Sequence, residues 1–503
     1  MRRTRRMSGK QIRLLIATLA LAALPASAAE IRVPAAETPA PLPVAPSAYA
    51  PVAKDAAHTG SIGALDSLAK GKLFDESRAD ELQSALTSLQ AGDAAATIAT
   101  RDALPAGSAD RLTLTFALAT ESGALASHQL ASAIAELAGW PAQDIMRRNL
   151  ERALYRERAS GAQVAKQLGS REPLTMEGHM LLARAALGSG QEDAARKAIA
   201  PFWRAARLEA AQESTLLREF GSLLTEADHR ARMEQMLHLD RANSAQRVAK
   251  QAGREDLAKA WAAVLRRDRA AGKLLDAVPD QQRADAGYIF AKARHLRWSG
   301  QYREAAAVML KAPTDAEALV DPDAWWIERR VLSRELLDLG DARTAYRLAA
   351  AHAAESPVHA VDAEFHAGWY ALRGLNDAKT AERHFKALLE ASARAHDQAR
   401  ALYWLGRTAE KRRDAAATAY FRRAAHFPAT FYGQLAAARI GDMVPPGAVY
   451  RVTDADRLAF AARPEVIAIS LMERGGEESR ARRLYLALAA SLEKPVELQL
   501  LAE

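Results

Sequence analysis

The chain has 503 residues, of which 49% are hydrophobic and only 6% aromatic, and its formal net charge is +8. It contains no cysteine, which excludes disulfides, thiolate metal sites, cysteine nucleophiles and lipid attachment at a cysteine. The length allows roughly two to four ordinary domains or one long solenoid. Alanine is abundant, and because it is the best helix former it favours closely packed helices over a sheet.

The first 28 residues have the pattern of a secretory signal peptide. Six basic and no acidic side chains accompany the apolar run from Leu14 to Leu24, and Ala26-Ser27-Ala28 fits a cleavage site. Cleavage would lower the net charge from +8 to +2 (8 − 6), so the basic pI does not indicate a nucleic-acid partner. No later segment is apolar over the length that a membrane helix needs. We therefore predict export to the periplasm, with no lipid anchor and no transmembrane segment after cleavage.

Residues 29–60 are rich in proline and alanine. Six prolines fall between Pro34 and Pro51. Because proline lacks a backbone donor, such a segment cannot form regular hydrogen-bonded structure. We predict an extended linker here.

Residues 61–440 show helical spacing of apolar side chains and contain repeats. The repeated strings are LRWSGQYREAA (296–306), LLDLGDARTAY (336–346), LRGLNDAKTAE (372–382), EKRRDAAATAY (410–420) and an earlier LGSGQEDAARKA (187–198). Gly300, Gly340, Asn376 and Arg413 hold the same turn position, at spacings of 40, 36 and 37 residues. The pattern predicts helical hairpins in which a first helix ends at a left-handed residue and a second follows.

Each predicted hairpin leaves an apolar face that only the next hairpin can cover. The stripe Leu402, Leu405, Gly406 and Ala409 is one such face. We therefore predict an all-α fold, a superhelix or solenoid of hairpins similar to tetratricopeptide repeats. The irregular spacing favours a ring- or U-shaped superhelix over an open groove.

The sequence changes character after Gly441. Val444-Pro445-Pro446-Gly447 breaks the helical pattern, which resumes at about 454–461, 464–474 and 477–491. The last residues begin another apolar helix for which the sequence shows no partner. We therefore expect the chain to be truncated within a further domain, 441–503.

Several strings identify a likeness to a known family. They are SREPLT (170–175), FWRAARLEAAQESTLLREFGSLLTEADHRARM (202–233), WWIERRVLSRELLDLGDARTAY (325–346), EFHAGWYALRGLNDAKTAERHF (364–385), YWLGRTAEK (403–411) and FYGQLAA (431–437). In their order and spacing they resemble soluble lytic murein transglycosylases, periplasmic enzymes that cut peptidoglycan glycan strands. The resemblance implies a superhelical domain over 61–440 and the start of a linker domain over 441–503, ahead of a lysozyme-like catalytic domain.

The resemblance also says which catalytic residue to look for. The family uses one carboxylic acid, half-buried so that its pKa rises, and the sugar's own hydroxyl attacks to leave a 1,6-anhydro end. That Glu stands in a Glu-Ser pair, usually after Gln, and a Gly-Leu-Met-Gln segment follows. Gln212-Glu213-Ser214 matches the pair and its preceding Gln but fails on context, because no Gly-Leu-Met-Gln follows it and Phe220-Gly221 marks a non-catalytic segment. No catalytic residue is transferred, and we predict that this chain alone is inactive.

Arginines and aromatic residues are the candidates for contact with substrate. Arg329, Arg330 and Arg334 lie along one predicted helix, where they form either a basic face for acidic stem peptides or ordinary solvated charge. Trp325-Trp326 and Trp369 are interpreted as core anchors, with sugar stacking as the alternative. The predicted substrate contacts are Arg329, Arg330, Trp369, Tyr403, Trp404, Tyr432 and Gln434.

Metal ions and cofactors are not expected. Asp228-His229 and His238 share no helical face with a third ligand, and no Gly-rich phosphate loop is present. The later histidines are interpreted as scattered through different hairpins; they are His352, His359, His366 and His384.

Two classes of function follow. The first is the helical scaffold of a lytic transglycosylase, whose partners are peptidoglycan glycan strands and, as further candidates, other cell-wall proteins. The alternative is a non-enzymatic periplasmic adaptor of helical repeats that binds protein partners. A third reading, an enzyme with a site inside the solenoid, has the least support because no catalytic motif is present.

Overall fold

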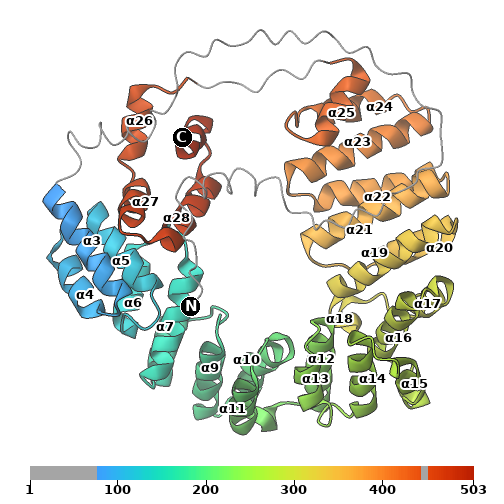
Figure 1. Ribbon diagram of the computed structural model, residues 1–503, viewed down its shortest axis with the longest axis horizontal. Helices are drawn as coiled ribbons and strands as arrows, with labels where there is room; N and C mark the ends of the chain where they lie inside the picture. Colours follow the sequence, from blue (N-terminus) through green and yellow to red (C-terminus); the bar gives the residue numbers. More distant parts are fainter. Residues whose placement is uncertain (1–75, 443–450) are drawn as a thin grey trace, which may run out of the picture. The chain divides into compact units, whose positions relative to one another are not determined.

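The structure is a computed structural model and describes residues 76–442 and 451–503. Within these ranges every regular element is a helix (Figure 1). The described residues belong to one compact unit, Ser61–Glu503. The predicted signal peptide (1–28) and proline-rich linker (29–60) lie outside the described residues, and the domain boundary at residue 440 stays a prediction.

The helices are short and follow one another closely. Those of the first part are α3 (Glu76–Gln90), α4 (Ala94–Ala103), α5 (Ala109–Thr120), α6 (Ser127–Glu136), α7 (Gln143–Arg156), α8 (Gly161–Leu168), α9 (Met176–Gly188), α10 (Glu192–Ala205), α11 (Ala210–Phe220), α12 (Glu226–His238), α13 (Ala242–Val248), α14 (Glu255–Leu265) and α15 (Ala271–Asp276). Those of the second part are α16 (Ala286–Trp298), α17 (Tyr302–Met309), α18 (Ala316–Leu319), α19 (Pro322–Asp338), α20 (Ala342–Ala350), α21 (Pro357–Trp369), α22 (Ala378–Ala391), α23 (Ala395–Lys411), α24 (Ala417–Ala425) and α25 (Phe431–Ile440). Across the described ranges, no helix combines the length and the apolar character needed to cross a bilayer.

The predicted turns adopt the backbone conformation that the repeats require. Gly300 and Gly340 have φ of 75° and 79°, and Asn376 and Arg413 have φ of 57° and 55°. Each of these residues follows the first helix of a hairpin and lets the chain reverse. The predicted turn position is thus confirmed in all four repeats, including the one where arginine replaces the small residue.

Aspartate begins the second helix in two of these hairpins. The side chain of Asp341 accepts a hydrogen bond from the Thr344 N–H at 3.0 Å, and Asp377 accepts one from Thr380 at 3.0 Å. These side chains satisfy backbone donors that have no partner within the helix. The Gly/Asn-Asp pair in the sequence therefore fixes both the end of one helix and the start of the next.

Glycine allows the paired helices to approach closely. A Cβ atom at Gly368 on α21 would lie 2.7 Å from the Phe385 ring on α22, and one at Gly406 on α23 would lie 2.6 Å from the Phe421 ring on α24. Two successive hairpins thus use the same contact, a phenylalanine of the second helix placed against a glycine of the first. Leu402, together with the rest of its predicted stripe, is buried at this contact face.

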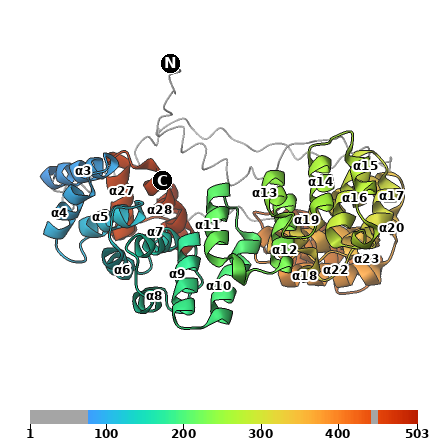
Figure 2. The same ribbon diagram turned by 90° about the horizontal axis from the view of Figure 1, so that it is seen from below.

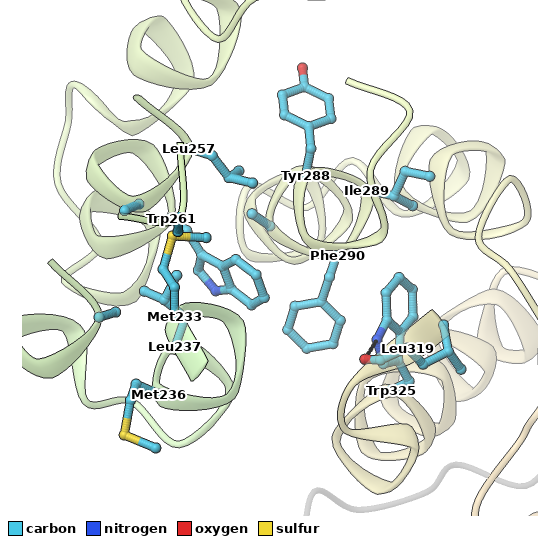
Figure 3. Packing of buried hydrophobic residues seen from close by; sticks show 14 of the residues in the cluster. Met233, Met236, Leu237, Leu257, Trp261, Tyr288, Ile289, Phe290, Leu319 and Trp325 are labelled. Carbon is cyan, nitrogen blue, oxygen red and sulfur yellow. Dashed lines mark hydrogen bonds between the residues drawn. The ribbon is translucent and has the colours of Figure 1, made fainter. Parts of the chain in front are cut away.

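Aromatic side chains join successive hairpins in the centre of the chain (Figure 3). The rings of Trp261 on α14 and Phe290 on α16 lie 5.4 Å apart, and Phe290 meets Trp325 on α19 edge to face at 5.0 Å. The Trp325 indole N–H donates to the Leu319 carbonyl at 3.0 Å. Trp325 and Trp326 are both buried, which confirms their interpretation as core anchors.

The predicted helices after Gly441 are present. They are α26 (Asp454–Ala461), α27 (Pro464–Arg474), α28 (Glu478–Ser491) and α29 (Pro495–Ala502). α27 packs against α3 and α5, and both views of the molecule place it beside them (Figures 1 and 2). Apolar residues of α26–α29 and of α3–α9 form one hydrophobic cluster.

Polar contacts reinforce this packing. Arg480 on α28 forms an ion pair with Glu121 and donates to the Thr120 hydroxyl at 3.2 Å. Gln90 at the end of α3 donates to the Gly475 carbonyl at 3.3 Å. Helices from the two ends of the described chain are therefore fixed to each other by both apolar and polar side chains.

The expectation that the final apolar helix lacks a partner is wrong. α29 contacts α26 and α28, and Leu500 is buried in the cluster that these helices share with α3–α9. Arg457 on α26 also forms an ion pair with Glu503. The helices that α29 contacts are its neighbours in sequence, and the cluster that they form is completed by helices from the other end of the described chain.

We predict that Gly406→Ala lowers the thermal unfolding temperature. The added methyl group would press on the Phe421 ring, and overpacking of this kind costs about 1–3 kcal/mol. The matched control is Gly188→Ala in α9, where no heavy atom lies within 4 Å of the added Cβ. The control should be neutral or slightly stabilising. Equal melting temperatures for the two variants would contradict the proposed Gly–Phe contact.

Candidate functional site

The predicted substrate contacts fall into two groups on the structure. The first group comes from α19 and α21, and the second from α23 and α25. The members are Arg329, Arg330 and Trp369 in the first group, and Tyr403, Trp404, Tyr432 and Gln434 in the second. An aromatic contact links the groups, because Phe365 on α21 lies 6.2 Å from Trp404 on α23.

Arg329 points into the protein core. Only 1% of its surface is exposed, and its guanidinium carbon lies 5.7 Å from the centre of the Trp325 ring. None of its three guanidinium nitrogens has a hydrogen-bond acceptor within the described ranges. Burial lowers the pKa of Arg329 to about 10. We therefore leave Arg329 out of the candidate contact surface.

Arg330 is held by a carboxylate between two helices. It donates to Asp362 Oδ2 on α21 at 3.0 Å, and the same oxygen accepts the Trp326 indole N–H at 3.0 Å. Burial acts to raise the pKa of Asp362, but His366, Arg330 and the two hydrogen bonds outweigh it and lower the pKa. Arg330 thus joins α19 to α21, and its side chain is half-buried.

Trp369 lies half-buried at an irregular point of its helix. It directly precedes a π-helix, Tyr370–Gly374. The Tyr370 hydroxyl is 3.1 Å from Ser333 Oγ, and a Cβ atom on Gly374 would lie 2.8 Å from that of Ala342. π-Helices of a single turn occur often at functional sites. Trp369 is thus the aromatic member of the first group, and it is partly accessible.

The second group is an aromatic cluster with a polar edge. The Tyr403 ring lies 5.4 Å from that of Tyr432, and Trp404 stacks on Phe385 with ring centres 5.9 Å apart. Tyr403 is buried, whereas Trp404 and Tyr432 are half-buried. Gln434 is exposed and donates to the Pro428 carbonyl at 3.1 Å. The surface available to a ligand here is the edge formed by Tyr432 and Gln434.

His352 and His384 belong to different hairpins, as interpreted, but both contact one carboxylate. His352 Nε2 lies 3.1 Å from Glu364 Oε1, and His384 Nδ1 lies 2.7 Å from Glu364 Oε2. The other nitrogen of His384 is 3.2 Å from the Tyr346 hydroxyl. Burial acts to raise the pKa of Glu364, but the hydrogen bonds from both imidazoles lower it to about 2. Sequence spacing gave no signal for this cluster, because its members come from three successive helices or turns.

No metal-binding group is found across residues 76–442 and 451–503. No set of three or more His, Asp or Glu side chains there has an arrangement that could hold an ion. Asp228, considered above as a ligand, instead pairs with Arg196 and Arg204. Burial acts to raise the pKa of Asp228, but hydrogen bonds from Thr225 and these arginines lower it to about 2.

Glu213 is a structural carboxylate. Its Oε1 atom accepts a hydrogen bond from Arg232 at 2.7 Å, and its other oxygen pairs with Arg247. Arg232 also donates to the Trp203 carbonyl and lies over the Trp203 ring, 4.2 Å from its centre. Glu213 therefore connects α11 to α12 and α13 and has no free position from which to protonate a ligand.

Glu234 on α12 has the raised pKa that a general acid needs, but its side chain is buried. Burial raises its pKa to about 7, with a further contribution from Asp285. The side chain packs against Gly287, where an added Cβ would lie 3.0 Å from the carboxyl carbon and from the Trp261 ring. Glu234 is buried and lines neither of the two cavities described below.

An arginine-rich cavity of about 710 Å³ lies where several hairpins meet. We call it the arginine cavity. Its charged and aromatic lining residues are Arg241, Arg247, Arg266, Arg267, Arg294, Trp298, Glu209 and Asp240. They come from the start of α11, the α12–α13 turn with α13, the end of α14 and the end of α16. The sequence offered one signal, the Arg266-Arg267 pair at a helix end, but not the other residues that face it.

A second cavity, of about 520 Å³, lies among α6, α7 and α8. Its lining is more apolar and includes Ile134, Leu150 and Leu168. The carboxylate that reaches it, Glu151, accepts hydrogen bonds from the Leu174 and Thr175 amides. This carboxylate therefore serves to fix the entry into α9.

Comparison with solved structures identifies the fold. An inactive mutant of lytic transglycosylase Slt from Pseudomonas aeruginosa aligns with a TM-score of 0.54 and 16% identity, over 83% of this chain and 66% of that chain. The 70-kDa soluble lytic transglycosylase from Escherichia coli aligns over 84% of this chain and 67% of that one, with 15% identity and a TM-score of 0.43. No protein-family model matches the chain, and no curated protein sequence is significantly similar.

The first of these alignments has a clear meaning for the fold. It covers most of the present chain, so an all-α superhelix of helical hairpins like that of soluble lytic transglycosylases is confirmed. The chain spans just under two thirds of the Pseudomonas protein. At 16% identity the similarity establishes the fold and leaves activity to be argued separately.

We predict that Arg329→Met stabilises the protein. The substitution removes a buried charge without a partner, and apolar replacement of buried ions often gains about 1–4 kcal/mol. The neighbouring Arg330→Met is the matched control. It removes a hydrogen-bond donor from Asp362 and should lower the free energy of unfolding by about 1 kcal/mol. Chemical denaturation of both variants tests this, and a loss of stability in Arg329→Met would contradict it.

We predict that Glu234→Gln changes the pH dependence of stability. The pKa of Glu234 is raised to about 7 in the folded state. Its contribution to the stability of the folded state is therefore complete below about pH 4.5 and is lost as pH rises through 7. The variant should match the wild type near pH 4.5 and be more stable above pH 7, by on the order of 3 kcal/mol. Melting curves from pH 4.5 to 8.5 measure this. The exposed Glu304→Gln should follow the wild type throughout.

Proposed function

We propose that this chain is the helical scaffold of a periplasmic protein of the lytic transglycosylase type, and that it binds and positions peptidoglycan glycan strands. The observation that carries the proposal is the superhelical fold shared with the Pseudomonas lytic transglycosylase over 83% of the chain. Glycan cleavage that leaves 1,6-anhydro ends is the activity that this assignment implies for a protein with the family's catalytic residues. Export is supported by the basic and apolar pattern of residues 1–28.

The chemistry of the described carboxyl groups favours binding over cleavage. A single general acid must be accessible and must keep its proton near neutral pH. Glu213 fails the first condition, because it is buried and both of its oxygens pair with arginines. Glu234 meets the pKa condition but is buried away from both cavities. We therefore assign no cleavage step to the described helices.

The surface chemistry supports a glycan-bearing partner. Half-buried aromatic residues with polar edges, Trp369 and Tyr432, offer flat faces of the kind on which sugar rings stack. Gln434 adds an exposed amide beside Tyr432, and amides hydrogen-bond well to sugar hydroxyls. Partner proteins of the cell wall are a further candidate, while nothing in the described surface favours nucleic acid.

The test is binding of the purified mature chain to isolated peptidoglycan sacculi. We expect the chain to sediment with sacculi and to release no 1,6-anhydro muropeptides, as measured by chromatography and mass spectrometry. Release of these products would contradict a role in binding alone. A chain that stays in the supernatant would contradict the proposed function and favour the protein-binding adaptor.

A pair of glutamine variants makes the test specific to the predicted edge. Gln434→Ala should weaken sacculus binding about fivefold, because it removes one hydrogen-bonding side chain worth about 1 kcal/mol. Gln251→Ala alters another exposed glutamine, in the α13–α14 connection, and should bind like the wild type. Equal binding by both variants would remove the Tyr432–Gln434 edge from the proposed contact surface.

A further inference from the structure

The arginine cavity contains more positive charge than its own carboxylates balance. Five arginines line it, against the two carboxylates of Glu209 and Asp240. Its volume of about 710 Å³ lies within the range of small-ligand sites, which is roughly 300–1,000 Å³. An excess of this size in a concave site attracts anions.

Two of the five arginines are already committed to internal ion pairs. Arg241 pairs with Glu209 at 3.0 Å and donates to the Leu208 carbonyl. Arg247 pairs with the buried Glu213 and donates to Ser244 Oγ at 3.0 Å. These two arginines hold the walls of the cavity in place.

The other three arginines have donors to spare. Arg266 donates to the neutral Asn243 side chain at 3.2 Å, and Arg267 makes no ion pair with any described residue. Arg294 reaches Asp240 only at 3.5 Å and Glu328 only at 3.9 Å. Unlike the first two, these guanidinium groups are not saturated by the protein.

Trp298 orients two of these groups. The guanidinium carbon of Arg267 lies over its ring at 4.8 Å from the centre, and that of Arg294 at 4.7 Å. Stacking uses the face of a guanidinium and leaves the N–H groups along its edge free to donate. Such a fork matches the two oxygens of a carboxylate, and the indole beside it offers an apolar surface for an aliphatic segment.

We propose that the arginine cavity binds the carboxylates of an acidic peptide attached to a glycan strand, that is, the stem peptide of peptidoglycan. This inference rests on the proposed function and adds the part of the polymer that the scaffold recognises. The arginine cavity thus replaces Arg329 and Arg330 as the proposed contact with stem peptides. Arg329 is buried and Arg330 is bound to Asp362, whereas Arg266 and Arg267 are exposed.

Calorimetric titration of the mature chain tests the proposal with two soluble probes. The first is a disaccharide-peptide from peptidoglycan with its acidic stem intact, and the second is the same disaccharide after removal of the peptide. We expect the stem-bearing probe to bind at least about tenfold more tightly, since each charge-assisted hydrogen bond is worth about a factor of ten or more. Equal affinity for the two probes would overturn the proposal.

A matched pair of double variants locates the site. Arg266→Gln with Arg267→Gln should lower affinity for the stem-bearing probe at least about tenfold. Arg422→Gln with Arg423→Gln removes two adjacent exposed arginines of α24 and should leave the affinity unchanged. Because all four side chains are exposed, both variants should melt like the wild type, which the same samples can confirm.

The outcomes separate this proposal from the proposed function. If the Arg266/Arg267 variant binds the stem-bearing probe like the wild type while the wild type still binds sacculi, the cavity is not the stem site and the scaffold function stands. If the wild type binds no sacculi, the scaffold function itself fails. Inorganic phosphate at equal concentration should not displace the stem-bearing probe; full displacement would show a general anion site and overturn the peptide assignment.

Discussion

The structure depends on one constraint, that no helical hairpin can bury its own apolar surface. The hairpins are too thin to enclose a core, so each presents a face that the next must cover. Glycine makes the contact within a hairpin close enough, as Gly406 does against Phe421. Between hairpins, large rings such as Phe290 and Trp325 fill the remaining space. The hydrophobic core of the described residues is therefore spread along the chain as a seam of successive clusters and is not gathered at one centre.

Polar side chains that enter this seam must be satisfied across a hairpin boundary. Glu213 is held by arginines from the two helices that follow it, and Glu364 by histidines from either side. Since removing one partner would leave a buried charge alone, such clusters fix the rotation of one hairpin against the next. Arg329 and Glu234 are two exceptions: burial lowers the pKa of Arg329 and raises that of Glu234.

The sequence was sufficient where a structural feature is local. The left-handed turns at Gly340 and Asn376 followed from the repeats, and the boundaries of α26 and α27 followed from the helical pattern of the residues. It was insufficient where side chains meet across hairpins. The Glu364 cluster and the arginine cavity both depend on how far each hairpin rotates relative to its neighbour, and residue spacing does not record that angle. The predicted substrate contacts included residues of both kinds, because helical periodicity did not distinguish the buried Arg329 from the half-buried Arg330.

The packing of α27 and α28 on α3 and α5 has a consequence for the order of folding. Arg480 and Glu121 are separated by 359 residues, whereas most hairpin contacts are local. Local hairpins form quickly, but contacts between distant segments must wait for the chain that joins them. The hairpins synthesised first are thus among the last to be fully packed. Their apolar surface stays uncovered until the residues after 464 have been synthesised. A chaperone that shields this surface during synthesis would have α3–α7 as its natural client segment.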